Sequence, residues 1–151
     1  MKKNKLIFLR HGQSKWNLEN RFTGWADVDL TKNGVKEAEN AGKLLLSYNY
    51  NVDLVYTSVL KRAIKTTEIC LNQLKLNNSE VSFDWRLNER HYGALQGLNK
   101  EETAKRYGDD QVHIWRRSYD VRPPKMDYRD EYHPRNNELY KDIKSNMLPS
   151  S

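Results

Sequence analysis

Residues 6–12 read Leu-Ile-Phe-Leu-Arg-His-Gly, so four apolar residues are followed at once by Arg10, His11 and Gly12. A short and wholly apolar run of this kind is typical of a strand that is buried on both faces of a parallel sheet. A buried strand that ends in an arginine and a histidine has reached either solvent or a bound anion. The rest of the sequence indicates whether these two side chains meet solvent or an anion.

Helical and strand-like segments alternate after this run. Thr31 is a good N-cap for a helix whose apolar residues recur at helical spacing over residues 35–46. Residues 52–56 predict a second strand, Ser58 predicts the start of a second helix, and the alternation over residues 81–85 predicts a third strand. Strand, helix, strand, helix, strand predicts an α/β fold with a mainly parallel sheet flanked by helices.

The remaining sequence is more polar. Residues 99–107 and 111–119 predict two helices outside the core. Between residues 116 and 135, charged residues make up half of the stretch and three prolines interrupt it. Residues 118–151 are therefore predicted to be loop-rich, as a long loop, a lid or a disordered tail without a core element. With 151 residues, the chain is expected to form a single domain.

Composition limits the partners. The net charge is +6, but the 26 Lys and Arg residues are scattered without a basic block. This favours small anionic ligands and argues against nucleic acid. Cys70 is the only cysteine, which excludes an intrachain disulfide and fits a reducing compartment. The apolar run at residues 6–9 is too short for a signal peptide, and no membrane span is present, so we expect a cytoplasmic protein without a membrane partner.

Polar residues follow each predicted strand. Arg10 and His11 follow the first, Ser58 and Arg62 follow the second, and Glu89 follows the third. Because the carboxyl ends of parallel strands meet at one edge of a sheet, these side chains are expected to converge. Arginine forks suit phosphate oxygens, a neutral histidine nitrogen can attack phosphorus, and a carboxylate can move the hydroxyl proton. The convergence therefore predicts phosphoryl transfer.

Each of these signals is weak when taken alone. An isolated Arg-His-Gly is more often an ordinary loop, and Glu89 by itself is typical of a solvated carboxylate. His91, His113 and His133 have no apolar strand directly before them and are predicted to lie at the surface or in loops. No set of Cys and His has the spacing of a metal site, so no metal is expected. The four tryptophans are predicted to be packing residues.

Three long stretches of the sequence make a functional site a better interpretation than ordinary loops. They are LIFLRHGQSKWNLENRFTGWADVDLTKNG, VYTSVLKRAIKTTEI and LNERHYGALQGLNKEETAKRYG. Together they resemble the cofactor-dependent phosphoglycerate mutases of the histidine phosphatase superfamily. The resemblance runs from residue 5 to about residue 124 and fades after that. It implies that His11 is the phosphorylated nucleophile and that Glu89 donates and accepts the proton. The positions that match the phosphate pocket and the substrate contacts are Arg10, Ser14, Asn17, Thr23, Gly24, Arg62, Tyr92, Lys100, Arg116 and Arg117.

The resemblance also implies an activity. It is the interconversion of 3-phosphoglycerate and 2-phosphoglycerate in glycolysis and gluconeogenesis, an intramolecular phosphotransfer primed by 2,3-bisphosphoglycerate without a metal. A histidine-type phosphatase of the same superfamily is the first alternative. A catalytically incomplete fragment or a non-catalytic module that binds polyanions is the second. A homo-oligomer is a further possibility.

The resemblance is incomplete at the C-terminal end. Family members carry a second histidine, in a His-Gly-Asn context, that completes the phosphate pocket, and this sequence has no such motif. Residues 1–151 are thus expected to be a truncated mutase-like domain that lacks the C-terminal part of the family domain. We expect such a chain to be a poor mutase by itself, and to be prone to aggregate or to bury its open sheet edge against another chain.

Overall fold

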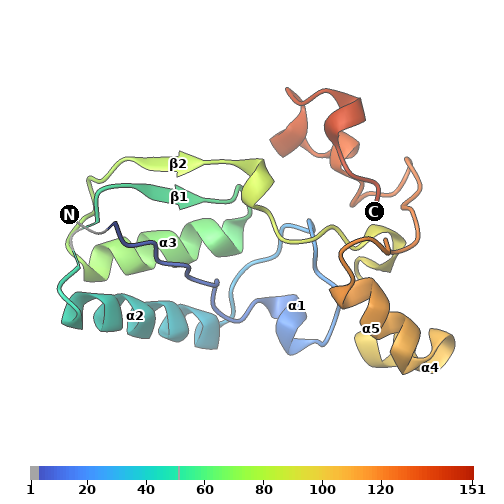
Figure 1. Ribbon diagram of the computed structural model, residues 1–151, viewed down its shortest axis with the longest axis horizontal. Coiled ribbons are helices and arrows are strands. Elements are labelled where there is room, and N and C mark those ends of the chain that lie inside the picture. The colour runs from blue at the N-terminus through green and yellow to red at the C-terminus, as the bar shows by residue number, and fades with distance from the viewer. Residues whose placement is uncertain (1–3, 51) are drawn as a thin grey trace.

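The computed structural model describes residues 4–50 and 52–151 (Figure 1). Its sheet consists of β1 (Val55–Thr57) and β2 (Val81–Phe83), which run parallel with Val55 opposite Val81. Helix α3 (Lys61–Gln73) connects the two strands, and α2 (Lys32–Ser47) packs against α3. Both helices lie on the same side of the sheet in Figure 1. The predicted α/β fold with a parallel sheet is confirmed.

Local chemistry explains where α2 begins and how closely it packs. Thr31 is the N-cap, and its hydroxyl accepts a hydrogen bond from the Gly34 backbone N–H at 3.0 Å, as the sequence predicts. Gly42 lies where α2 crosses α3, and a Cβ there would lie 3.0 Å from the Cα of Cys70. The missing side chain therefore lets the two helices approach each other. The Cys70 thiol is buried in this contact.

The second half of the fold is built around a small apolar cluster. It contains the short α1 (Lys15–Leu18), the polar helices α4 (Lys100–Tyr107) and α5 (Asp109–Arg117), and five 3₁₀ turns. Phe22, Leu95 and Val112 form its core, each no more than 5% exposed. Asn99 caps α4 by accepting from two backbone N–H groups of its first turn. None of the helices in the described residues has the length and hydropathy needed to cross a bilayer.

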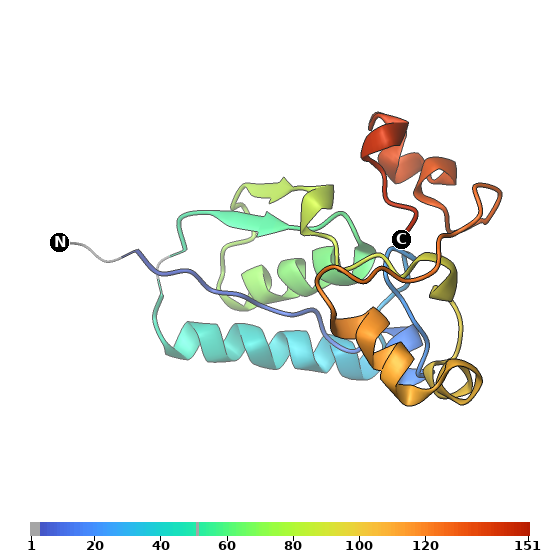
Figure 2. The same ribbon diagram turned by 45° about the vertical axis from the view of Figure 1, so that its right-hand side comes forward.

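The predicted buried strand at residues 6–9 is wrong. Residues 4–10 belong to no strand, and no backbone hydrogen bond joins them to other described residues. Leu6 is 78% exposed and Phe8 is 89% exposed. Figures 1 and 2 show this segment running lengthwise past the sheet and the two helices without joining the sheet. A strand in the middle of a parallel sheet needs a hydrogen-bonded strand on each side, and the described part of the chain pairs no strand with this segment.

Two further expectations need correction. The second helix begins at Lys61 rather than at Ser58, whose hydroxyl instead accepts from the Leu60 N–H in the turn before the helix. The segment 118–151 contains only loops and the 3₁₀ turns η3 (Pro134–Asn136), η4 (Glu138–Tyr140) and η5 (Ser145–Met147), but it is not without core residues. Tyr140 is 2% exposed because its ring packs on Trp25.

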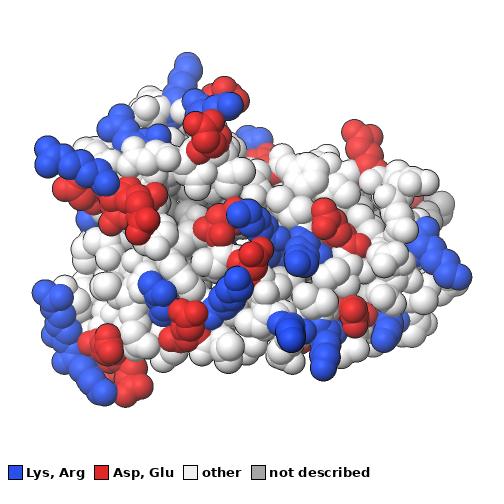
Figure 3. Space-filling view, turned by 180° about the vertical axis from the view of Figure 1, so that it is seen from behind, with Lys and Arg blue, Asp and Glu red and all other residues white. Residues whose placement is uncertain are grey.

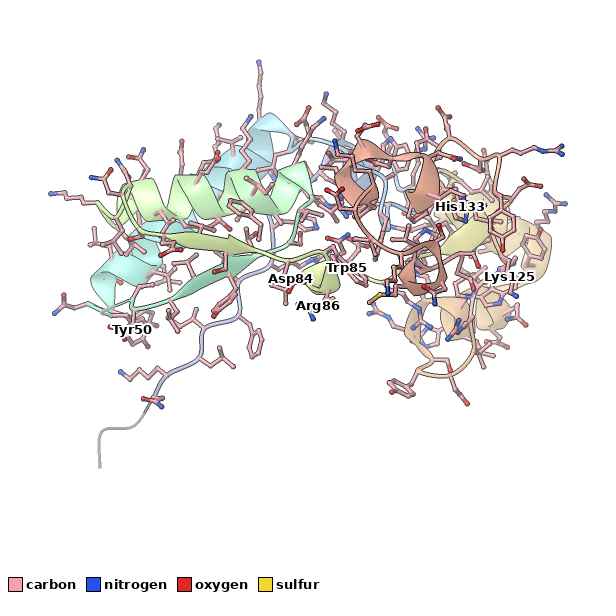
Figure 4. All side chains as sticks on the ribbon, turned by 90° about the horizontal axis from the view of Figure 1, so that it is seen from above. Tyr50, Asp84, Trp85, Arg86, Lys125 and His133 are labelled. Carbon is pink, nitrogen blue, oxygen red and sulfur yellow. The ribbon has the colours of Figure 1, made fainter. Side chains whose placement is uncertain are left out.

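His91 and His133, predicted to lie at the surface or in loops, do lie in loop segments, but both are buried. His91 packs edge-on against Trp25, and His133 lies within the C-terminal segment (Figure 4). In both rings Nδ1 accepts a backbone N–H, from Gly93 and Arg135 respectively. Each ring therefore carries its proton on Nε2, and neither Nε2 has a hydrogen-bond partner. His113 is exposed, as predicted.

Candidate active site

The His11 ring has a defined tautomer. Its Nδ1 lies 2.7 Å from the carbonyl oxygen of Gly12. A carbonyl oxygen only accepts, so Nδ1 carries the ring proton and Nε2 presents a lone pair. The backbone fold around this ring depends on Gly12, since a Cβ there would overlap the Gly34 backbone at the start of α2.

Arg62, in the first turn of α3, lies against the unprotonated nitrogen of that ring, Nε2. Its side chain is 1% exposed. Nε donates to His11 Nε2 at 3.3 Å, and Nη2 donates to a Glu89 carboxylate oxygen at 3.0 Å. The guanidinium also donates to the backbone oxygens of Gly24 and Ala26, at 2.7 and 2.9 Å. A buried cation is tolerable here because all of these acceptors satisfy it.

The turn at residues 23–26 supplies two of those acceptors. Gly24 has a φ of +53°, which is a backbone conformation that favours glycine. The Trp25 backbone N–H donates to the side-chain oxygen of Gln96 at 2.7 Å, and its indole N–H donates to the Glu89 backbone oxygen at 2.8 Å. The Thr23 hydroxyl is buried without a hydrogen-bond partner. The turn thus connects Arg62 to the segment that carries Glu89.

Glu89 faces both the histidine and the arginine. Its Oε2 lies 3.7 Å from His11 Nε2, and the side chain is 37% exposed. Burial alone would raise the pKa of Glu89, but the contact with His11 and the charge of Arg62 outweigh burial and lower the pKa. Glu89 is therefore ionised at neutral pH. An ionised carboxylate beside a histidine is suited to accept a proton.

Cationic side chains from the polar helices lie near Glu89. Lys100 is the first residue of α4, and Arg116 and Arg117 form the last turn of α5. Burial, followed by the charge of Arg116, lowers the pKa of Lys100. Burial and the negative charge of Glu89 raise the pKa of Tyr92. Tyr92 and Lys100 are thus both within electrostatic range of Glu89 and of Arg116, and Tyr92 is also within range of Arg117.

The other predicted residues are placed differently. Arg10 is exposed, although its charge is close enough to contribute to the lowered pKa of Lys100. Ser14 and Asn17 form a capping box that starts α1, with each side chain accepting the other's backbone N–H. A pocket of about 530 Å³ reaches Glu89 and Arg90 but is not lined by His11 or Arg62, so it lies beside the histidine site.

Two side chains that support the site, Asp27 and Gln96, were not predicted from the sequence. The Asp27 carboxylate accepts the backbone N–H of Lys61 at 2.7 Å and so satisfies the first turn of α3, directly before Arg62. Gln96 holds Trp25, as described above. Both lie inside the stretches GWAD and GALQG of the resemblance, but sequence spacing gave no reason to pair them with α3 or with the turn.

The arrangement combines a histidine whose Nε2 lone pair accepts a long hydrogen bond from Arg62, a buried guanidinium and an ionised carboxylate. These are the groups needed to take a phosphoryl group onto nitrogen and to move a hydroxyl proton. Within residues 4–50 and 52–151, no cluster of three or more His, Cys, Asp or Glu residues has the arrangement of a metal site.

Several solved structures of known proteins are similar to this chain. A mycobacterial glucosyl-3-phosphoglycerate phosphatase is 26% identical, with a TM-score of 0.64 over 88% of this chain and 60% of its own. A phosphoglycerate mutase from Bacillus anthracis is 26% identical, with a TM-score of 0.59 over 70% of this chain and 47% of its own. A phosphoserine phosphatase from Entamoeba histolytica is 27% identical, with a TM-score of 0.58 over 75% of this chain and 52% of its own.

This chain therefore spans about half of the length of these solved structures. The sequence pattern of the histidine phosphatase superfamily, branch 1, matches residues 6–149, which is nearly all of the chain. Together with the His11, Arg62 and Glu89 geometry, this match shows that the chain belongs to the histidine phosphatase superfamily, branch 1.

Proposed function

We propose that this chain carries the phosphohistidine chemistry of a 2,3-bisphosphoglycerate-dependent phosphoglycerate mutase. The observation that carries the proposal is the His11 ring, whose Nδ1 is held on Gly12 while Nε2 faces Arg62 and Glu89. Nε2 attacks phosphorus, the phosphorus–oxygen ester bond breaks, and the leaving oxygen takes a proton from the carboxyl of Glu89, which the negative charge of the bound phosphoryl group favours in its protonated form. The long 3.3 Å hydrogen bond from Arg62 Nε to His11 Nε2 has to break before this attack, because it occupies the attacking lone pair.

The roles of the neighbouring residues follow from their charges. Arg62 stabilises the charge on the transferring phosphoryl oxygens, because its planar fork is buried beside the nucleophile. Glu89, ionised at neutral pH, accepts the hydroxyl proton when phosphohistidine is discharged. Arg10, Ser14, Asn17, Thr23 and Gly24 are proposed to contact the substrate at the phosphate end.

The residues present fit 2,3-bisphosphoglycerate as the priming molecule. When bound, 2,3-bisphosphoglycerate supplies the phosphoryl group. The positive charges of Arg10 and Arg116 already contribute to lowering the pKa of Lys100, which indicates an excess of positive charge that a polyanion would neutralise. We propose that Lys100, Arg116, Arg117 and Tyr92 hold the carboxylate and the second phosphate.

A histidine-type phosphatase is the second candidate. Two of the similar solved structures are phosphatases, and Glu89 can take a proton from water as well as from a sugar-acid hydroxyl. The cationic group on α4 and α5 favours the mutase, since a mutase has to bind the second anionic group of its substrate. On the face shown in Figure 3, Lys and Arg are interspersed with Asp and Glu, which gives no support to a general polyanion-binding stripe.

Labelling separates these functions. The chain is incubated with [³²P]2,3-bisphosphoglycerate, and we expect a protein adduct that is labile in acid and stable in alkali. His11→Ala should carry no such label, and retention of label in that variant would refute the assignment. The labelled protein is then chased with 3-phosphoglycerate. Transfer of label to phosphoglycerates supports the mutase, and release as inorganic phosphate at the same rate with or without 3-phosphoglycerate supports the phosphatase.

A further inference from the structure

The Gln96 side chain is buried between the turn at residues 23–26 and the segment that follows Glu89. It is 6% exposed, and its amide oxygen accepts the Trp25 backbone N–H at 2.7 Å. Gln96 is held at its own backbone by the 3₁₀ turn η2 (Gly93–Leu95), where its N–H donates to the Gly93 oxygen. The side chain thus reaches across from a separately anchored element.

The orientation of this amide is fixed by its partner. A backbone N–H only donates, so the oxygen of the amide faces Trp25 and the nitrogen points elsewhere. Gln96 Nε2 is buried without a hydrogen-bond partner. Burying an unpaired amide donor is unfavourable, so the hydrogen bond that the amide oxygen accepts from the Trp25 N–H has to compensate for it.

The turn that Gln96 holds is the one on which Arg62 rests. Gly24 and Ala26, on either side of Trp25, are the two backbone acceptors of the Arg62 guanidinium. Gly24 also lies in direct contact with Gln96, because a Cβ at Gly24 would overlap the amide oxygen. A shift of the turn therefore moves two of the four groups that fix the guanidinium beside His11.

We propose that Gln96 is a positioning residue, which fixes Arg62 beside His11 by holding the Trp25 N–H through its amide oxygen. This inference rests on the proposed function only for the effect of Gln96 on the rate of His11 phosphorylation. The effect of Gln96 on the position of Arg62 is independent of any reaction. Small displacements of a positioned group cost about tenfold to a hundredfold in rate.

The test uses variants that separate the acceptor from the rest of the side chain. Gln96→Met keeps the length and removes the acceptor, Gln96→Asn keeps the amide and loses reach, and Gln96→Glu keeps an acceptor at the same distance. Gln73→Met, at the far end of α3, is the matched control. The first readout is the ¹⁵N–¹H signal of Arg62 Nε, which is identified by its loss in Arg62→Lys. The second is the rate of His11 phosphorylation at saturating 2,3-bisphosphoglycerate.

We expect Gln96→Met and Gln96→Asn to shift or broaden the Arg62 Nε signal and to lower the phosphorylation rate by about tenfold or more, with little change in the half-saturating donor concentration. Gln96→Glu should restore the signal and most of the rate, and Gln73→Met should leave both unchanged. If Gln96→Met does not fold, the comparison of Gln96→Asn with Gln96→Glu decides.

An Arg62 signal that stays in place in both Gln96→Met and Gln96→Asn would overturn the proposal, and so would a Gln96→Glu variant as impaired as Gln96→Met. If the unmodified chain forms no phosphohistidine, the proposed function fails, but the Arg62 signal still decides whether Gln96 positions the arginine.

Discussion

The region around His11 buries a charged side chain, whereas the sheet half of the molecule leaves apolar side chains exposed. Around His11, the guanidinium of Arg62 is almost fully buried and makes four hydrogen bonds. In the sheet half, apolar side chains such as Phe8 and Leu54 are 89% and 75% exposed. Figure 4 shows Asp84, Trp85 and Arg86 at the end of β2, where the chain crosses from one half to the other.

This difference shows which parts of the fold the site depends on. The contacts of Arg62 come from the turn at residues 23–26, from Glu89 and from His11, all of which lie outside β1 and β2. The start of α3 is held by Asp27, the residue that follows this turn. The geometry of the site is therefore supported by its own loops, by the first two turns of α3 and by the start of α2, which Gly12 contacts, while the outer surface of the sheet half contributes little to it.

The largest effect is expected at Glu89, in the site half. Glu89→Gln keeps the shape of the side chain but can neither donate a proton to the leaving oxygen nor accept one from the attacking hydroxyl, so both phosphorylation of His11 and its discharge should slow. General acid–base groups contribute about a hundredfold to ten-thousandfold. Rapid-quench measurement of the two half-reactions tests this. Unchanged rates would reduce Glu89 to a partner of Arg62.

A pH effect on stability is expected at His91. Burial, together with the nearby His133, lowers the pKa of His91 from its usual 6.5 to about 4. The folded state holds this ring neutral, whereas the unfolded chain binds a proton below its ordinary pKa. Stability from neutral His91 is thus present above about pH 6.5 and is lost as the pH falls towards 4, by up to about 3 kcal/mol.

Urea unfolding at pH 7 and at pH 4.5 measures this contribution. Other carboxyl and histidine groups also titrate in this range, so the result is the difference between the chain and its His91→Gln variant. We expect the acid loss to be smaller in the variant. His113→Gln, at an exposed histidine, is the control and should keep the full loss. Equal losses in all three proteins would show that His91 is solvated.

A smaller but specific effect is expected from Arg62→Lys. An ammonium keeps the charge but cannot reach His11, Glu89 and two backbone oxygens at once. The phosphorylation rate should fall by about tenfold or more, which corresponds to about 1.4 kcal/mol or more. Lys61→Arg, next in the chain but exposed, is the control. An unchanged rate would mean that the planar fork is not needed.

The sequence was sufficient to predict the features that depend on neighbouring residues, such as helix capping and the alternation of strands and helices. Thr31 begins α2 because a threonine hydroxyl can reach the N–H three residues on, and a strand, a helix and a strand from residue 52 to residue 85 formed the predicted parallel pair. The convergence of His11, Arg62 and Glu89 also followed from polar residues placed after strands, although the first of the three strands did not form.

The features that the sequence did not reveal depend on contacts between distant segments. Whether residues 6–9 become a buried strand depends on neighbours rather than on their own pattern. Tyr140 and His133 are buried because a polar, proline-interrupted segment folds back over the second half, where Tyr140 packs against Trp25. The pairing of Gln96 with Trp25 spans 71 residues and leaves no periodic signature.

The smallest effect on folding is expected at Phe8, in the sheet half. Because its ring is 89% exposed, Phe8→Ser should change the free energy of unfolding by no more than about 0.5 kcal/mol and should not change phosphorylation of His11. The buried Leu60, at 2% exposure, is the comparison, and Leu60→Ala should cost about 2–5 kcal/mol.

The same Phe8→Ser variant should lower self-association, because exposed apolar side chains beside an unpaired backbone segment favour contact with other chains. Sedimentation velocity over a range of concentrations measures this, with Tyr119→Ser, at an exposed tyrosine far from the sheet, as the control. If Phe8→Ser instead destabilises the chain as much as Leu60→Ala does, residues 6–9 are packed in solution. The contrast between the two halves would then be wrong, and the site would depend on the sheet after all.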